Sequence, residues 1–249
     1  MSTTMTSHAQ REYTDTIAAH IDALDWADIA DSLGRYGNAV LASVLTASEC
    51  EAVARLYPDN DVFRSRVVMD RHGFGRGEYK YFSYPLPAIV QVLRTMLYGR
   101  LAPVANAWNA SLNVDARYPD ELAAFTERCR AAGQSRPTPL LLQYRAGDFN
   151  CLHQDLYGEH VFPIQVAFLL SAPSKDFDGG EFVLTEQRPR MQSRVEVVPL
   201  RQGDGVAFAV HHRPVQGSRG VYRVTMRHGV SRVRSGTRYT MGIIFHDAE

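Results

Sequence analysis

The segment from residue 144 to residue 155 ends in a histidine and a carboxylate that could bind a metal. It reads YRAGDFNCLHQD, so His153 and Asp155 lie two positions apart. On a strand, residues two apart point to the same face. An imidazole beside a carboxylate suits a divalent metal of intermediate softness. One more histidine would complete the set of two histidines and one carboxylate that holds non-haem Fe(II) and leaves three coordination positions open.

His228 is the best candidate for the third ligand, and Arg238 follows it at the start of a strand-like run. Arg238 and Thr240 are two apart on this predicted strand, so their side chains should face the same way. A guanidinium binds a carboxylate through two parallel hydrogen bonds. A hydroxyl beside it can donate to the same carboxylate. Arg238 and Thr240 could therefore bind a carboxylate together.

An HxD motif, a distant His and an Arg about ten residues later resemble the 2-oxoglutarate and Fe(II)-dependent dioxygenases. The resemblance is closer to the prolyl-hydroxylase-like branch, in which a tyrosine and a glycine precede the HxD, as Tyr144 and Gly147 do here. Residues 139–247 also resemble a bacterial oxygenase family that has been predicted to act on damaged nucleic acid.

The resemblance implies a catalytic set of His153, Asp155, His228 and Arg238. Fe(II) would be bound by the first three, and the far carboxylate of 2-oxoglutarate by Arg238 with Thr240 and Tyr144. O₂ would be the second cosubstrate and ascorbate a candidate reductant. The expected reaction hydroxylates a substrate C–H and releases succinate and CO₂.

The composition of the chain limits the kinds of partner that it can bind. The chain has 249 residues and a formal net charge of zero, which argues against binding nucleic acid or membrane over the whole surface but not through a local patch. Residues 206–246 contain seven arginines and no Asp or Glu. Three cysteines without paired spacing fit a reducing compartment. With no apolar signal core or membrane span, we expect a cytoplasmic protein that does not bind membranes.

The pattern along the chain predicts an α+β fold with a mainly β core. Residues 1–12 are expected to be disordered, and residues 13–249 to form a single dioxygenase domain. Within it, residues 13–136 should be mainly helical support: one helical run from Thr14 to Gly34, a capping box from Thr46 to Glu49, and helices from Pro87 to Tyr98 and from about Val104 to Leu112. Short strands are also expected after Gly37, from Val62 to Met69 and from Tyr79 to Ser83. Residues 137–249 should form the β core, because they contain seven or eight short β-prone runs separated by turn residues. That count fits a double-stranded β-helix, the jelly-roll or cupin-like fold of such dioxygenases, braced by the N-terminal helices.

Three other features have simpler interpretations. The GGEF run at residues 179–182 predicts a turn followed by a strand. Cys151 has the same strand parity as His153, and we expect a buried, inert thiol there. His211 and His212 could line the mouth of a substrate pocket, but a solvated loop is the favoured interpretation.

The sequence leaves three functions open. The preferred one is hydroxylation of a peptide or small molecule of unknown identity. The second is oxidative demethylation of alkylated DNA or RNA, for which the arginine-rich segment 206–246 would contact phosphates. Against it, nucleic-acid demethylases of the AlkB type carry a second arginine six residues after the cosubstrate arginine, and this chain has Ile244 at that position. The third is a non-catalytic cupin-like module, which the complete set of metal and acid ligands disfavours.

Overall fold

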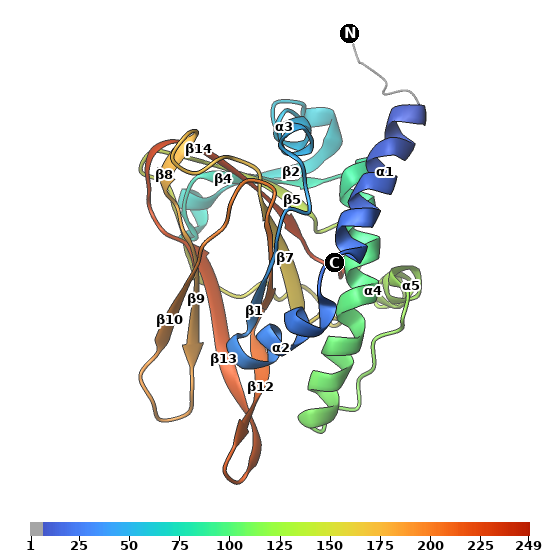
Figure 1. The fold of residues 1–249 in the computed structure, drawn as a ribbon, viewed down its shortest axis with the longest axis vertical. Coiled ribbons are helices and arrows are strands. Elements are labelled where there is room, and N and C mark those ends of the chain that lie inside the picture. Colours follow the sequence, from blue (N-terminus) through green and yellow to red (C-terminus); the bar gives the residue numbers. More distant parts are fainter. Residues whose placement is uncertain (1–6) are drawn as a thin grey trace.

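Two antiparallel sheets facing each other form the core of the structure (Figure 1). The structure is a computed structural model that describes residues 7–249, with side chains from residue 15. The larger sheet runs in the order β1 (Asn38–Leu41), β11 (Gly205–Ala209), β7 (Ile164–Leu169), β14 (Val233–Ile243), β5 (Leu140–Arg145), β4 (Glu78–Phe82) and β2 (Phe63–Val68), and β8 (Phe177–Gly179) pairs with β14. The smaller sheet runs β10 (Arg194–Val198), β9 (Phe182–Gln187), β13 (Gly220–Val230), β6 (Phe149–His153) and β3 (Gly75–Arg76), and β12 (His212–Gly217) pairs with β13. The predicted double-stranded β-helix is confirmed.

Strand β7 shows why the core strands are apolar on both faces. All six of its residues are buried. Ile164, Val166, Ala167 and Phe168 belong to the main hydrophobic core, and Gln165 and Ala167 line a cavity between the sheets. A strand that contacts a packed layer on each side reads as a continuous apolar run rather than an alternating one.

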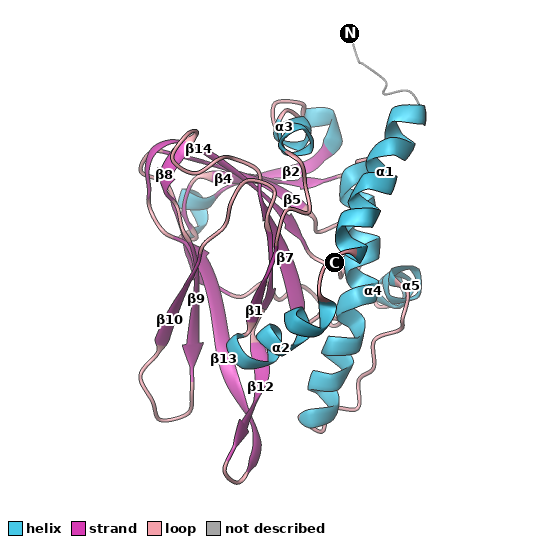
Figure 2. Cartoon of the chain, viewed as in Figure 1, coloured by secondary structure: helices cyan, strands magenta, loops and turns pink. Residues whose placement is uncertain are grey.

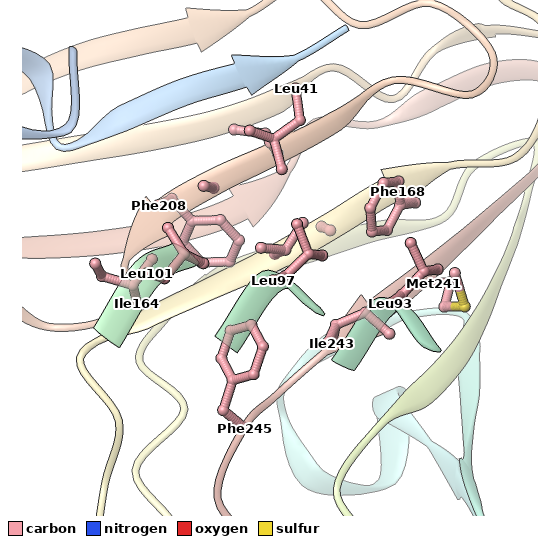
Figure 3. Packing of buried hydrophobic residues seen from close by; sticks show 14 of the residues in the cluster. Leu41, Leu93, Leu97, Leu101, Ile164, Phe168, Phe208, Met241, Ile243 and Phe245 are labelled. Atoms are coloured by element: carbon pink, nitrogen blue, oxygen red, sulfur yellow. The ribbon is translucent and has the colours of Figure 1, made fainter. Parts of the chain in front are cut away.

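Helix α4 (Ala88–Ser111) packs on the larger sheet. Leu93, Leu97 and Leu101 are spaced four apart, so they lie on one face of the helix. Figure 3 shows them against apolar side chains of the sheet, among them Ile164, Phe168, Phe208, Met241 and Ile243, and against Phe245 just after β14. Each fully buried leucine contributes about 1.5–3 kcal/mol, so this face fixes α4 to the sheet.

The remaining helices lie on the same side of the molecule as α4 or at its edges (Figure 2). They are α1 (Ser7–Asp22), α2 (Trp26–Tyr36), α3 (Ala47–Ala54) and α5 (Leu122–Ala131), with 3₁₀ turns η1 (Asn60–Val62) and η2 (Met69–His72). The expected helical bracing of one sheet is therefore observed. The capping box is confirmed, because Thr46 and Glu49 satisfy each other's backbone amides at the start of α3.

Two expectations about the helices of the N-terminal half need correction. The run from Thr14 to Gly34 is two helices, because the Asp25 carboxylate caps a new helix by accepting from the amides of Ala27 and Asp28. The two helices expected around residue 103 are one, α4, with Pro103 inside it. An internal proline costs about 3 kcal/mol, which the packed face of α4 outweighs.

The predicted support region also supplies four strands. β1 pairs with β11 and β4 pairs with β5 in the larger sheet, and β3 pairs with β6 in the smaller sheet, so both sheets extend into the N-terminal half. Of the segment expected to be disordered, residues 1–6 lie outside the described residues, and residues 7–12 belong to α1. Among the described helices, none combines the length and apolar content needed to cross a lipid bilayer.

Candidate active site

The structure brings His153, Asp155 and His228 together. His153 Nε2 lies 3.5 Å from Asp155 Oδ1, and His228 Nε2 lies 3.4 Å from Asp155 Oδ2. Each of the three residues offers one ligand atom, and these three atoms lie within 4.8 Å of one another. Ligands at about 2.1 Å from a shared metal, at right angles, would be ~3 Å apart. The three residues are therefore spaced for binding one cation.

The two histidines come from neighbouring strands of the smaller sheet. His228 on β13 is the direct partner of His153 at the end of β6, and their ring centroids are 4.1 Å apart. The register between these strands then shifts, so that Val230 pairs with Asn150. This irregularity adds one residue to β6 just before His153, which is how a β-bulge redirects a side chain.

The bulge explains why Cys151 was wrongly placed. Strand parity predicted that Cys151 and His153 share a buried face, but Cys151 is exposed, and Asn150 lines the cavity with His153 instead. Asp155 also departs from the simple strand argument, because β6 ends at His153 and Asp155 lies in the following loop.

A tyrosine fixes the carboxylate in that loop. Tyr157 donates a hydrogen bond of 2.8 Å to Asp155 Oδ1, and the Tyr81 hydroxyl of β4 lies 3.2 Å from the Tyr157 hydroxyl. His153 is oriented in a similar way, since its Nδ1 lies 2.8 Å from the Cys151 carbonyl oxygen. This contact leaves His153 Nε2 facing the carboxylate. Partners of this kind fix the orientation of metal ligands.

The charges in the cluster favour metal-binding protonation states. Burial alone would raise the pKa of Asp155, but hydrogen bonding to His228 and the charges of both histidines outweigh it and lower the pKa. Burial, followed by the charge of His153, lowers the pKa of His228. Metals bind ionised carboxylates and neutral imidazoles. The donor set therefore fits a divalent metal of the non-haem iron type.

Arg238 is a buried cation in the same cavity. It is 1 % exposed and forms no ion pair with any described residue. One of its terminal nitrogens donates to the Thr240 hydroxyl, while its Nε has no hydrogen-bond partner within residues 15–249. Burial lowers its pKa to about 10, so it stays charged at neutral pH. A buried charge without a partner is costly, which indicates that an anion binds here.

Tyr144 lies beside Arg238. The two residues are direct partners across β5 and β14, and the guanidinium carbon is 5.6 Å from the centre of the Tyr144 ring. The Tyr144 side chain is fully buried, and its hydroxyl finds no hydrogen-bond partner among the described residues. Burial raises the pKa of Tyr144, so the hydroxyl stays protonated and can donate a hydrogen bond to an anion.

One cavity joins the metal-binding cluster to the buried arginine. Its volume is about 230 Å³, and it lies between the two sheets. Apart from the residues already described, aromatic and aliphatic side chains form most of the wall, including Phe74, Tyr79, Leu140, Leu142, Phe182, Phe208 and Val230. A mostly apolar cavity with a few convergent polar groups is the usual form of a small-molecule site.

Gly180 is a site residue that sequence reasoning missed. The predicted strand is observed, because β9 begins at Phe182, but Gly179 ends strand β8 and only Gly180 and Glu181 connect the two strands. Gly180 has a φ of +63°, and a Cβ atom there would lie 2.9 Å from Cδ of Arg238. The absence of a side chain thus makes room for the Arg238 stem. The two adjacent glycines were visible in the sequence, but their contact with Arg238 joins distant segments.

Other predicted residues lie elsewhere. His211 and His212 line a separate cavity of about 220 Å³ beside Trp108, not the cavity of the metal-binding cluster. Of the seven arginines in residues 206–246, Arg213 is buried against Glu186, and Arg238 lies in the main cavity. The other five are exposed: Arg219 lies in the turn before β13, Arg223 and Arg227 on β13, Arg232 in the turn that follows and Arg234 on β14.

Comparison with known proteins identifies the family. Residues 77–248 match the model of the Oxygenase-NA family, whose description reads "Oxygenase, catalysing oxidative methylation of damaged DNA". This match covers more than half of the chain. The chain belongs to the Oxygenase-NA family. The matched region begins just before β4 and includes every residue of the metal-binding cluster and the Arg238 site.

Two proteins from Mycobacterium tuberculosis are similar in sequence to this chain. Uncharacterized protein Rv2227 of strain ATCC 25618 / H37Rv and Uncharacterized protein MT2286 of strain CDC 1551 / Oshkosh are each 51% identical to this Oxygenase-NA chain over 209 residues. The alignments cover 82% of this chain and 90% of each relative.

Solved structures share the fold. An oxidoreductase of the 2OG-Fe(II) oxygenase family from Burkholderia pseudomallei aligns with a TM-score of 0.52 at 18% identity, covering 91% of this chain and 94% of that one. A prolyl hydroxylase from Trichoplax adhaerens, in complex with a peptide fragment of hypoxia inducible factor, gives 0.53 at 14% identity, with 98% and 94% covered. A prolyl-4-hydroxylase from Pseudomonas putida gives 0.50 at 15% identity, with 90% and 99% covered. At these identities the likeness concerns the fold.

Proposed function

We propose that this Oxygenase-NA protein is an Fe(II)- and 2-oxoglutarate-dependent dioxygenase that hydroxylates a substrate C–H. The observation that carries the proposal is the unpaired, buried Arg238 in the same cavity as the metal-binding cluster. A metal site alone would fit many cupin-like proteins. The cluster leaves coordination positions open on the metal, and Arg238 beside it needs an anion. A diacid that chelates the metal through one end and pairs with Arg238 through the other fits both.

Each residue has a defined role in this proposal. His153, Asp155 and His228 hold Fe(II), which supplies O₂ activation coupled to decarboxylation of 2-oxoglutarate to succinate and CO₂. Arg238 pairs with the far carboxylate of 2-oxoglutarate. Thr240 and Tyr144 supply hydroxyl groups beside the guanidinium for the same carboxylate.

The surrounding residues position and shield these groups. Tyr157 and the Cys151 carbonyl oxygen orient Asp155 and His153. The apolar wall, which includes Phe182 and Phe208 packed against the His228 ring, limits water near the metal. Exclusion of water strengthens the pairing of Arg238 with its anion and suppresses side reactions.

The test is succinate release with Fe(II), 2-oxoglutarate and O₂, in the absence and presence of substrates. Ascorbate, the candidate reductant, is included in one arm. His153→Ala should abolish turnover, and Arg238→Gln should raise the 2-oxoglutarate concentration needed for it. A protein that binds metal but never forms succinate would point to the non-catalytic module instead.

Two substrate classes follow from different observations. The fold is shared with a prolyl hydroxylase bound to a peptide fragment, which supports a peptide or small-molecule C–H. The family description names damaged DNA, which supports oxidative demethylation of alkylated nucleic acid: hydroxylation of an N-methyl group, followed by loss of formaldehyde. Mass spectrometry of a methylated single-stranded oligonucleotide and of a proline-containing peptide after turnover separates them. Loss of a methyl group from the oligonucleotide supports oxidative demethylation of nucleic acid. Gain of one oxygen by the peptide supports hydroxylation of a peptide.

A further inference from the structure

The wall of the active-site cavity includes an aromatic side chain that is half exposed. Phe74 lines the cavity that holds the metal-binding cluster, yet it is 47% exposed. It belongs to residues 71–76, Arg-His-Gly-Phe-Gly-Arg, which we call the mouth loop. An aromatic ring that is both cavity wall and surface can contact a planar group at the entrance.

The backbone at Phe74 is fixed. Its amide donates to the Met69 carbonyl at 3.2 Å, and its carbonyl accepts from the Cys151 amide at 2.9 Å. Gly75 permits this close approach to β6, because a Cβ atom there would lie 2.4 Å from the Phe149 carbonyl oxygen. The ring is therefore presented by a defined backbone next to the strand that carries His153.

The flanking side chains provide a second ring and positive charge. The His72 and Phe74 rings are stacked, with centroids 5.3 Å apart and planes at 23°. Arg71 and Arg76 are exposed and form no ion pair with a described residue. Asp70 precedes the loop and, with Asp148, lines a neighbouring groove that includes Arg76. The positive charge of Arg71 and Arg76 is therefore confined to this loop. It suffices to contact one or two phosphates rather than a long stretch of nucleic-acid backbone.

From this arrangement, and resting on the proposed function, we propose that the mouth loop binds an unpaired nucleotide of single-stranded nucleic acid. The base stacks on Phe74 at the cavity entrance, and Arg71 and Arg76 contact the adjacent phosphates. Stacking rings interleaved with basic side chains are the usual means of binding single strands without reading their sequence. The exposed arginines spread along β13 are not required for this contact.

The test measures binding of a short, fluorescein-labelled single-stranded oligodeoxynucleotide containing one N-methylated adenine. The protein is loaded with Mn(II) and 2-oxoglutarate. Phe74→Ala should weaken binding about 5- to 150-fold, the range for loss of one stacked base, and Phe74→Trp should retain it. Tyr36→Ala is the matched control, because Tyr36 is an aromatic residue with 46% exposure on α2 and does not line the cavity; its affinity should equal wild type. Arg71→Gln should reduce the salt dependence of log K by about 0.7.

Equal affinity of Phe74→Ala and wild type would overturn the proposal, as would no binding of the oligonucleotide by the wild type at low salt. Binding of a proline-containing peptide with the same Phe74 dependence, and not of the oligonucleotide, would assign the mouth loop to a peptide. Anaerobic binding of Fe(II) and 2-oxoglutarate, measured separately, distinguishes the failures. If these still bind when the oligonucleotide does not, the oxygenase stands and only its substrate is wrong.

Discussion

Replacing Tyr157 by phenylalanine tests whether this tyrosine positions the Asp155 ligand. The substitution removes one hydroxyl and keeps the ring, so packing changes little. The lost contacts are the 2.8 Å hydrogen bond to Asp155 Oδ1 and the 3.2 Å contact with the Tyr81 hydroxyl, and only the first touches the proposed metal ligand. A hydrogen bond to a charged acceptor contributes about 1.5–3 kcal/mol, which corresponds to roughly a 10- to 150-fold change in an equilibrium constant. Loss of second-layer partners of metal ligands typically costs 10- to 100-fold in affinity, so we expect metal binding to weaken by that amount.

The assay is calorimetric titration of the metal-free protein with Mn(II) or Co(II) under identical buffer conditions. Tyr81→Phe is the matched control, because its hydroxyl contacts Tyr157 at 3.2 Å and does not touch Asp155. Its effect on metal affinity should be several-fold smaller. An unchanged affinity in Tyr157→Phe, together with unchanged thermal stability, would show that Asp155 is held by other means.

Three further changes probe the rest of the site and the fold. Arg238→Gln removes the buried cation and should weaken 2-oxoglutarate binding at saturating metal by about 2–5 kcal/mol, measured by calorimetry, with metal affinity unchanged. Gly180→Ala should also weaken 2-oxoglutarate binding without affecting the metal, since the added Cβ would displace the Arg238 stem. Glu186→Gln leaves the buried Arg213 without its carboxylate and should lower the free energy of unfolding by about 3–5 kcal/mol in urea titrations at neutral pH. Burial alone would raise the pKa of Glu186, but hydrogen bonds from Arg188 and Arg213 outweigh it and lower the pKa. The contribution of the Glu186 carboxylate to the stability of the folded protein should therefore be present above the unfolded-state pKa near 4.3. It should be lost as pH falls through the lower folded-state pKa.

The β core could be predicted from the sequence because its information is local. Short β-prone runs separated by turn residues identified strands such as β5, β7 and β14. The HxD motif indicated the metal-binding cluster, and the resemblance to dioxygenases in the order of His153, Asp155, His228 and Arg238 pointed to the cation, since metal and carboxylate chemistry restrict residue types strongly.

The features that were missed depend on contacts between distant segments. The bulge beside His153 arises from the register of β6 against β13, which strand parity alone cannot reveal. The packing of Gly180 under Arg238 and the burial of Arg213 against Glu186 likewise require the folded chain. The helix through Pro103 shows tertiary packing outweighing a local preference.

The most direct test of the central claim is an anaerobic titration of the protein with Fe(II) and 2-oxoglutarate, followed by visible absorption. A 2-oxo acid chelated to Fe(II) absorbs visible light through charge transfer, so the band reports both ligands in one site. We predict that the band appears in the wild type only when both are present. It should be absent in His153→Ala, and in Arg238→Gln it should need far more 2-oxoglutarate. A wild-type protein that gives no band, or a His153→Ala protein that keeps it, would contradict the account.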